Sequence, residues 1–529
     1  MAGIPKGAPL FQDYIRGESH ACQFYYGNFR DPAVYREKAQ DVDGRFHRDA
    51  RARAVSMITA STEAAQDRLS RFADEGGYFV TTGQQPGLFT GPLYSLYKAL
   101  TAVRLAASLE GVLGRPVLAL FWIASEDHDW DEADHTTILD LSNDLQTIRV
   151  PAQEGSASRS LHRIQLERGL SETVEEFLGG LPETDFSPST FRLLRESYTP
   201  GRTLPGGFLD VMKELLARLP VAFVDSANAE LKEASLPILF REMEEAEEHE
   251  ASLVRMASHL ELEGYHVQVP ILEGGVNLFF EGDEGRDRVY REGRDFRLRR
   301  SGKRVTMDEI RSQAEADPSL VSPNVLLRPI LESTLFPTVS YVAGPSELSY
   351  FGQMKDLFRA HGLEMPVVHP RHSATLIEAK IRKVLSKFHR TPESLDRPFH
   401  EVAAEIALEE VPTEVRRSLG EIRGTLGRSA AALTKAAQTI DPTLKGPVNN
   451  ARNASFAAFD EAERKILQAL KREHEIALDQ MEKAQRHLFP FGKPQERVLN
   501  PFYYVTRYGP DFLSALSSEF VVDLGIGSA

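Results

Sequence analysis

Short apolar runs, each bounded by turn residues and followed by a helical pattern, constrain the fold more than any other feature of this sequence. Such runs occupy residues 78–82, 117–123, 221–224, 338–342 and 366–369. Strands that are apolar at nearly every position, rather than at alternate positions, are typical of a parallel sheet covered by helices on both faces. The sequence therefore predicts an α/β fold built on a parallel sheet.

The first crossover helix of that fold follows residue 92. Its apolar residues recur at helical spacing and predict one buried stripe: Leu93, Leu96, Tyr97, Leu100, Val103 and Ala107. Gly91 and Pro92 lie where the helix begins in this prediction, and we expect Thr90 or Gly91 to cap it, since proline suits a first helical turn. The stretch 81–100 is thus predicted to be a strand, a glycine-rich loop and a helix N-terminus.

Composition and charge exclude several classes of protein. A net charge of −15 argues against a general nucleic-acid binder, which needs a basic face. The single cysteine, Cys22, excludes an intramolecular disulfide and a multi-cysteine zinc site, as expected in a reducing cytoplasm. The longest apolar run, residues 117–124, is far shorter than the roughly 18 residues of a membrane span, and the N-terminus lacks the apolar core of a signal peptide. We expect a cytoplasmic protein without membrane or nucleic-acid partners.

Interruptions of the alternation predict the domain organisation. A segment rich in Ser, Glu and Gly indicates a helical insertion, and short runs broken by Gly and Asp turns indicate a β-hairpin insertion. The predicted division is a core in three parts (1–150, 216–276 and 322–385), a helical insertion (151–215), a β-hairpin insertion (277–321), an α-helical coiled coil (386–490) and a tail that packs on the core (491–529).

Long helical patterns dominate the later part of the chain. One stripe recurs at steps of mostly three, four or seven residues: Ile466, Leu470, Ala477, Met481, Ala484 and Leu488. Two helices joined through residues 441–450 would form an antiparallel hairpin, which is either a plain helical subdomain or a projecting coiled coil that makes a dimer. The aromatic residues that follow are expected to fold back onto the core: Phe489, Phe491, Phe502, Tyr503 and Tyr504.

Polar motifs follow the predicted strands, at the sheet edge where α/β proteins bind ligands. The first is the loop 83–92. Its glycines would let the backbone approach a ligand closely, and N–H groups at the helix start attract phosphate or carboxylate. Gln84 and Gln85 add amide groups, and Lys98 lies two turns into the helix. The alternative is an ordinary turn, because the spacing matches neither a P-loop nor a G-x-G-x-x-G fingerprint.

The second motif, "FWIASEDHDWDEADH" at 121–135, crowds acidic and imidazole groups after an apolar strand. Three interpretations stay open. His128 with Asp131 or His135 could bind a divalent ion. The segment could instead bind a substrate ammonium or hydroxyls, with His128 or a carboxylate as general base. It could also be a solvated acidic loop.

The third motif lies between residues 322 and 371. "AGPSE" follows a strand and begins a helix, so Gly344, Ser346 and Glu347 are predicted to face the same cleft. Arg328 and Arg371 offer guanidinium groups suited to carboxylate or phosphate. Either arginine could instead be a structural ion-pair partner.

These blocks together resemble a known family. "TTGQQPGLFTGPLYSLYKA", "FWIASEDHDWDEADH", "SPNVLLRPILESTLFPTVSYVAGPSELSYFGQMK" and "PVVHPRHS" are similar to the bacillithiol biosynthesis cysteine-adding enzyme family (BshC). The resemblance covers nearly the whole chain. It implies a Rossmann-like core related to class I aminoacyl-tRNA synthetases, with connecting insertions and a C-terminal α-helical coiled coil that mediates homodimerisation.

The resemblance also implies the activity, a ligase that joins the carboxyl of L-cysteine to the amine of glucosaminyl malate. Activation of the carboxyl requires a nucleotide, ATP or ADP, with or without Mg²⁺. Where synthetases carry a His-x-Gly-His signature this chain reads "FTGPLYSLYK". Whether AMP or ADP is released stays open.

The chemistry of these substrates leads to a hypothesis for each candidate residue. We assign acid–base catalysis to His128, Asp129 and Glu126. We assign substrate binding to Gln84, Gln85, Thr90, Asp127, Asp131, Arg328, Glu347, Tyr350 and Arg371. We assign phosphate or activated-carboxyl binding to Gly83, Gly87, Gly91, Lys98 and Gly344. No residue is assigned to a metal. The competing hypotheses are a metal-dependent hydrolase at 126–135, a non-catalytic assembly factor, and a ligase for another amino acid and amine.

Overall fold

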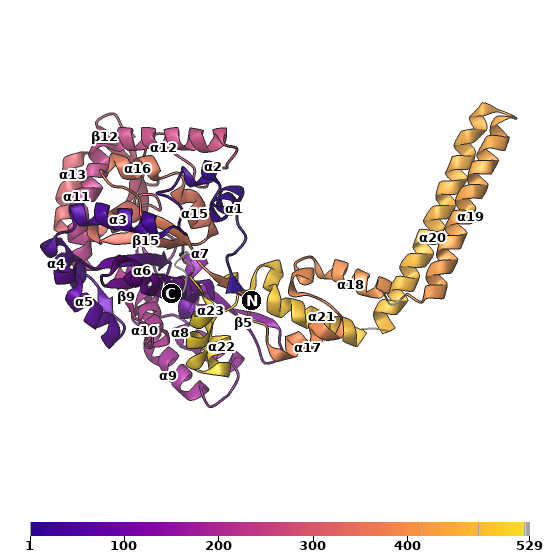
Figure 1. Cartoon of the computed structure of the whole chain (residues 1–529), viewed down its shortest axis with the longest axis horizontal. Coiled ribbons are helices and arrows are strands. Elements are labelled where there is room, and N and C mark those ends of the chain that lie inside the picture. The colour runs from indigo at the N-terminus through magenta and orange to yellow at the C-terminus, as the bar shows by residue number, and fades with distance from the viewer. Residues whose placement is uncertain (1, 410, 474, 523, 525–529) are drawn as a thin grey trace. The chain divides into compact units, whose positions relative to one another are not determined.

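The computed structural model describes residues 2–409, 411–473, 475–522 and 524 (Figure 1). The chain forms two compact units. One comprises Met1–Thr375 with Glu496–Ala529, and the other comprises Leu376–Gln495. Among the described residues, no helix is both long enough and apolar enough to cross a membrane.

The core of the larger unit is a mainly parallel sheet with the strand order β16–β15–β3–β4–β9–β2. Its members are β16 (Val367–Pro370), β15 (Thr338–Ala343), β3 (Tyr78–Gln84), β4 (Val117–Ile123), β9 (Val221–Asp225) and β2 (Thr59–Ala60). All neighbours pair in parallel except β2, which is antiparallel to β9. β4 is buried at every position, as strands covered on both faces must be. The predicted α/β fold and its parallel sheet are confirmed.

The strand order reverses at β3. The chain passes from β3 to β4 and β9 on one side, then returns to β15 and β16 on the other. In an open α/β sheet, the carboxyl ends at such a switch point border the ligand crevice. The carboxyl ends of β3 and β15 therefore mark where a ligand is expected.

The crossover helix α6 (Tyr94–Leu113) differs from the prediction in two respects. Its N-cap is Leu93, because residues 88–90 form a separate 3₁₀ turn, so capping by Thr90 or Gly91 is wrong. The helix is also buried on most of its circumference rather than along one stripe, and Ala107 is exposed. A central helix packed on several elements shows little amphipathicity.

Further helices of this unit pack on the sheet or lie beside the second sheet described below (Figure 1). They include α1 (Pro9–Arg16), α3 (Pro32–Arg45), α4 (Arg48–Ser56), α5 (Glu63–Glu75), α11 (Ala229–Glu244), α12 (Ala246–Leu262), α13 (Met307–Ala316), α14 (Arg328–Leu335), α15 (Pro345–Phe351) and α16 (Lys355–Ala360). Residues 135–215 add the antiparallel pair β5 (His135–Leu139) and β6 (Leu145–Arg149), then α8 (Leu170–Gly180), α9 (Ser187–Ser197) and α10 (Leu204–Leu215).

A second, antiparallel sheet has the order β13–β12–β11–β10–β14. Its strands are β10 (Gly275–Gly282), β11 (Gly285–Glu292), β12 (Asp295–Leu298), β13 (Arg304–Val305) and β14 (Val321–Pro323). β10 and β11 form a hairpin in which Phe279 is opposite Arg288. This hairpin supplies one wall of the cleft described below.

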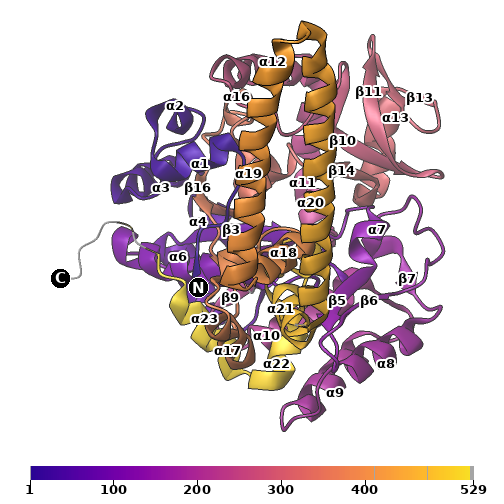
Figure 2. The ribbon, with the colours of Figure 1, turned by 90° about the vertical axis from the view of Figure 1, so that its right-hand side faces the viewer.

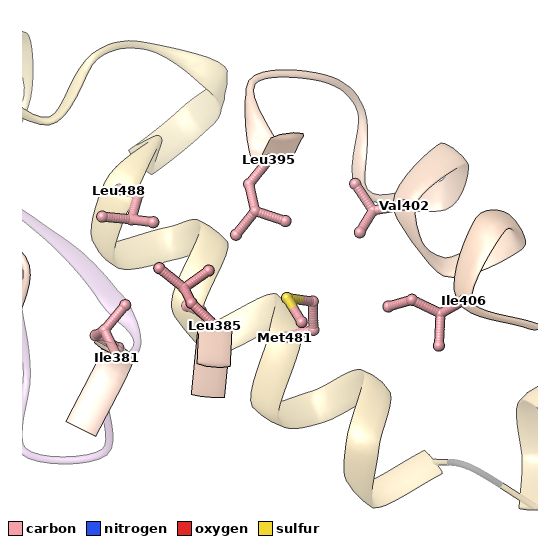
Figure 3. Packing of buried hydrophobic residues seen from close by; sticks show 8 residues of the cluster. Ile381, Leu385, Leu395, Val402, Ile406, Met481 and Leu488 are labelled. Carbon is pink, nitrogen blue, oxygen red and sulfur yellow. The ribbon is translucent and has the colours of Figure 1, made fainter. Parts of the chain in front are cut away.

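The smaller unit contains a packed base and a long hairpin. Its base buries residues of α17 (Ala379–Lys387), α18 (Phe399–Glu409) and α21 (Glu475–Leu488), among them Ile381, Leu385, Val402 and Met481 (Figure 3). The hairpin consists of α19 (Thr413–Gln438) and α20 (Lys445–Glu473), which lie side by side (Figures 1 and 2). Arg423 on α19 pairs with Asp460 at 2.6 Å and Glu463 at 2.7 Å on α20.

The connection between α19 and α20 is shorter than expected. Residues 445–450 already belong to α20, because proline at 447 lies in its first turn, where it costs no hydrogen bond.

The C-terminal aromatics separate into two groups. Phe502, Tyr503 and Tyr504 are buried in α22 (Phe502–Tyr508), which belongs to the larger unit with α23 (Asp511–Glu519). Phe489 instead packs on the base of the smaller unit, and Phe491 is 60% exposed. The expectation that all of them fold back onto the core is wrong for these two phenylalanines.

Candidate functional site

A cleft of about 580 Å³ opens at the carboxyl ends of β3, β4 and β15. It brings together most of the residues singled out from the sequence: Gly83, Gln84, Gln85, Lys98, Glu126, Asp127, His128, Arg328, Gly344, Glu347, Tyr350 and Arg371. Five others do not line it: Gly87, Thr90, Gly91, Asp129 and Asp131. The cleft lies at the switch point of the sheet, where the topology predicts a ligand.

The second half of the glycine-rich loop, residues 87–92, does not line the cleft and is held by the C-terminal tail. Asn500 donates its amide to the carbonyls of Phe89 at 2.8 Å and Gly91 at 3.2 Å. The N–H of Leu93, at the start of α6, donates to the carbonyl of Leu499 at 2.9 Å. This N–H is therefore already bonded to protein, which removes it from the expected phosphate cradle.

Two glycines of this loop are needed for backbone reasons. A Cβ at Gly83 would lie 2.8 Å from the carbonyl oxygen of Trp122 on the neighbouring strand, so only glycine fits there. Gly91 has φ +66°, and it follows Phe89 and Thr90, which also have positive φ. A β-branched threonine in this region is costly. The conformation of the loop is thus determined by these backbone constraints and by its contacts with the C-terminal tail.

A buried ion pair lies beneath the strand ends. The ammonium of Lys98 is 2.6 Å from Glu347 and donates to the Gly83 carbonyl at 2.7 Å and to Gln84 at 3.0 Å. Burial lowers the pKa of Lys98, and Glu347 opposes that shift. Glu347 also accepts from the Gly344 N–H at 2.8 Å and the Tyr341 hydroxyl at 2.8 Å. All three donors of Lys98 are engaged by protein, so it is not free to bind phosphate.

Arg328 continues this network. Its guanidinium pairs with Glu332 at 2.9 Å and donates to the hydroxyls of Tyr341 at 3.0 Å and Tyr350 at 3.5 Å. Burial raises the pKa of Glu332, and Arg328 opposes the shift. Burial also raises the pKa of Tyr350. Arg328 thus fixes the positions of Glu332, Tyr341 and Tyr350.

Arg371 is paired as well. It contacts Glu496, from the start of the C-terminal tail, at 2.5 Å, and both side chains are buried. Its guanidinium also lies 5.9 Å from the ring centre of Tyr94. Burial raises the pKa of Tyr94 to about 12. Arg328 and Arg371 both fit the ion-pair interpretation better than that of a free anion clamp.

Most carboxylates of the acidic segment form ion pairs or accept hydrogen bonds from nearby backbone N–H groups. Glu126 is buried and pairs with Lys232. Asp127 accepts from the N–H of His128 at 2.7 Å, and Asp129 accepts from the N–H of Glu132 at 3.2 Å, which caps a short helix. Asp134 pairs with Arg149. Within the described residues, the groups that converge as a metal-binding set lie outside this segment.

His128 has a defined hydrogen-bond role. Arg286, on β11, lies with its terminal nitrogen 3.1 Å from Nδ1 of His128. Because a guanidinium can only donate, Nδ1 must be the acceptor, and the neutral ring then carries its proton on Nε2. Burial and Arg286 lower the pKa of His128, so this neutral form prevails near pH 7. His128 therefore presents an N–H donor, not a free base.

The β10–β11 wall of the cleft carries cations that the sequence reasoning missed. Arg286 and Arg288 are two positions apart on β11 and lie 3.9 Å and 5.3 Å from the ring centre of Phe279. Among the described residues neither forms an ion pair with a carboxylate. Arg286 is buried and donates to the Ser322 hydroxyl at 2.9 Å and the Pro323 carbonyl at 3.0 Å. The sequence "GRDRVY" could have predicted this pair, because arginines at alternate positions of a strand lie on the same face.

Glu132 is a second missed residue. It lines the cleft, and desolvation together with the charges of Asp129 and Asp127 raises its pKa. Arg497, also at the cleft, opposes that shift. A carboxylate with a raised pKa is a better proton acceptor than an ordinary one.

Comparison with known proteins decides the family. Residues 3–372 match the model "Bacillithiol biosynthesis BshC, N-terminal Rossmann-like domain", and residues 374–522 match "Bacillithiol biosynthesis BshC, C-terminal coiled-coil domain". The chain belongs to the BshC family. Two relatives, each named "Putative cysteine ligase BshC", come from Salinibacter ruber and Chlorobaculum tepidum. The former is 30% identical over 97% of this chain and 94% of the relative. The latter is 32% identical over 96% and 94%.

A BshC relative from Bacillus cytotoxicus, which carries the same name, is 27% identical over 96% of this chain and 95% of its own length. A solved structure named "putative arginyl t-RNA synthetase", from Campylobacter jejuni, is 11% identical and covers 83% of this chain and 100% of that one, with a TM-score of 0.23. The Rossmann-like assignment rests on the BshC family model and the observed parallel sheet.

Proposed function

We propose that this BshC family member is a ligase of bacillithiol biosynthesis that joins the carboxyl of L-cysteine to the amine of glucosaminyl malate. The names of its relatives support a cysteine ligase. The observation that carries the proposal is the pair Arg286 and Arg288, which face a cleft at the switch point without carboxylate partners among the described residues.

The malate group of the amine substrate suits this pair. Malate brings two carboxylates, and guanidinium groups bind carboxylates through paired, charge-assisted hydrogen bonds. Phe279 holds both cations over its face, and Nε2 of His128 adds a donor beside Arg286. This assignment replaces Arg328 and Arg371, whose charges are already balanced by Glu332 and Glu496.

Glu132 is the proposed base. The attacking amine must lose a proton as the amide bond forms, and His128 cannot accept it at Nε2 or at Nδ1. Glu132 lines the same cleft, and its raised pKa favours proton uptake.

Activation of the cysteine carboxyl requires a cosubstrate, since an amine does not displace hydroxide from a carboxylate under mild conditions. We include a nucleoside triphosphate in the proposal for that reason. The residues first assigned to its phosphates do not fit, because Lys98 is paired with Glu347 and the loop around Gly87 and Gly91 is held by the tail. No step through the nucleotide is therefore assigned to them.

A coupled assay tests the function. Purified protein receives glucosaminyl malate, L-cysteine, ATP and Mg²⁺, and mass spectrometry follows the thiol product and the nucleotide. We expect bacillithiol with one equivalent of AMP or ADP, the two outcomes that indicate an adenylate and an acyl phosphate. Folded protein that forms no product with these substrates, but does with another amino acid or amine, would favour the ligase of altered specificity.

We also propose that the smaller unit makes a homodimer through the α19–α20 hairpin. Large apolar side chains are exposed on or beside it, including Leu433 at 58% and Ile440 at 82%. Sedimentation of the full chain should give a dimer mass, and Leu433→Glu should shift it toward the monomer. A monomeric wild-type protein at micromolar concentration would contradict the proposal.

A further inference from the structure

A cluster of two histidines and a glutamate lies outside the cleft's catalytic groups. Glu242 is near the end of α11, His249 is in the first half of α12, and His361 follows α16. Glu242 and His249 are 0% exposed, and His361 is 7% exposed. Helix α12 contacts both α11 and α16; the three helices are labelled in Figure 1.

The ligand atoms of the three side chains converge. Oε2 of Glu242 is 2.7 Å from Nδ1 of His249 and 3.2 Å from Nε2 of His361, and all three atoms lie within 4.8 Å of one another. Ligands of a tetrahedral ion with bonds of about 2.0–2.1 Å lie roughly 3.3 Å apart. The spacing is therefore close to that of a coordination shell.

His361 is hydrogen-bonded to Glu242 through Nε2, whereas the hydrogen bonding of His249 is incomplete. Neither ring nitrogen of His249 has a hydrogen bond of acceptable geometry, although the ring is fully buried. A buried polar atom without a partner is costly, and a metal ion would use the free lone pair. The two imidazole rings are stacked with centroids 4.0 Å apart, which places both of them against the same oxygen of Glu242.

Surrounding groups support the three side chains in the manner of a metal site. Oε1 of Glu242 accepts from the N–H of Asn277 at 3.0 Å, which turns Oε2 toward the histidines. Nε2 of His249 faces Glu245 at 3.5 Å, and Arg241 holds that carboxylate at 2.9 Å. A carboxylate behind a ligating histidine fixes the ring and increases its basicity.

We propose that Glu242, His249 and His361 form a structural site for one divalent transition-metal ion, with Zn²⁺ as the first candidate. Two imidazoles and a carboxylate suit Zn²⁺ better than Mg²⁺ or Ca²⁺, which prefer oxygen ligands. The ion would join α11, α12 and the end of α16. The site adjoins the cleft, because Asn277, which is bonded to Glu242, and Glu250, which follows His249, both line the cleft. This site goes beyond the proposed ligase activity and does not depend on it.

Metal binding to the full chain tests the proposal without an activity assay. Protein is treated with a chelator, desalted and titrated with Zn²⁺ or Co²⁺. We expect one high-affinity equivalent per chain, a rise in Tm with Zn²⁺, and visible absorption bands of four- or five-coordinate Co²⁺. Chelated, folded protein that binds no equivalent of either ion would overturn the proposal.

Two variants locate the ion. His249→Gln and His361→Gln should each weaken Zn²⁺ binding by more than the roughly 10–100-fold expected for loss of a supporting residue. His259→Gln is the matched control, because His259 is exposed on the same helix α12. If both variants keep the wild-type affinity, the ion binds elsewhere and the proposal fails. If neither variant folds, X-ray absorption of the zinc-loaded wild type decides, since fewer than two imidazole ligands would exclude this site.

Discussion

Two sides of one cleft use charge in opposite ways. Beneath the strand ends, Lys98 with Glu347 and Arg328 with Glu332 are paired within the protein. On the β10–β11 wall, Arg286 and Arg288 face the cleft over Phe279 with no carboxylate in ion-pair distance among the described residues. The paired side can support the fold without a ligand. The unpaired side has charges that an anionic substrate would neutralise, so we expect binding and chemistry to concentrate there.

The largest effect should follow loss of the proposed base, Glu132, which lines the cleft from the acidic segment that follows β4. Glu132→Gln removes the proposed base, and we expect kcat/KM to fall by about 10²–10⁴ with little change in Tm. The wild-type rate should decrease as the pH drops through the pKa of Glu132, which lies above its ordinary value, because only the carboxylate accepts a proton. The variant should lack this acid limb. Steady-state rates across pH measure both.

Asp131→Asn is the matched control, since Asp131 is exposed, adjacent in sequence and absent from the cleft lining. Equal losses in Glu132→Gln and Asp131→Asn would mean that the segment acts through its net charge and not through a base.

A change on the paired side should affect stability first. Lys98→Met leaves Glu347 as an uncompensated, largely buried charge, and we expect the free energy of unfolding to fall by about 3–5 kcal/mol. Denaturant unfolding measures it. Lys98→Met combined with Glu347→Gln should recover part of the loss, because the second change removes the orphaned charge. A Lys98→Met protein that is fully stable but inactive would contradict this prediction. It would mean that Lys98 binds the substrate and does not mainly support the fold.

Arg286→Gln should weaken substrate binding. Losing a charged hydrogen-bond partner costs about 1.5–3 kcal/mol, so kcat/KM should fall roughly 10–150-fold, mainly through KM for the anionic substrate. Arg294→Gln, in the exposed β11–β12 turn, is the control. An unchanged KM for glucosaminyl malate would remove the wall from the proposed recognition.

The sequence predicted the sheet well because burial on both faces leaves near-continuous apolar strands, as in β4. It also predicted which motifs share the cleft, since parallel strands end at one edge. It failed where partners are distant in sequence. Nothing local to the glycine loop indicates that Asn500 holds it, and nothing near Arg371 indicates Glu496.

The same limit applies to the roles of single residues. A cleft arginine looks alike in sequence whether it is paired, as Arg328 is, or unpaired, as Arg288 is. The tautomer of His128 depends on Arg286, which is 158 residues away. A contact between residues so far apart in sequence depends on how the β10–β11 hairpin packs against the core. The local sequence pattern around either residue does not predict it.

The smallest effect is expected for His128→Gln. This variant tests whether the groups beside Arg286 bind the substrate or take part in catalysis. Since Arg286 occupies Nδ1 and the proton is on Nε2, His128 contributes a donor that a glutamine amide can replace. We therefore expect His128→Gln to lose less than about tenfold in kcat, against the 10²–10⁴ of a lost base. In Arg286→Gln the pKa of His128 should rise, because the positive neighbour that lowers it is gone, and NMR titration of the ring reports the shift. A His128→Gln protein as impaired as Glu132→Gln, with the same missing acid limb, would show that substrate binding displaces Arg286 and frees the imidazole as the base.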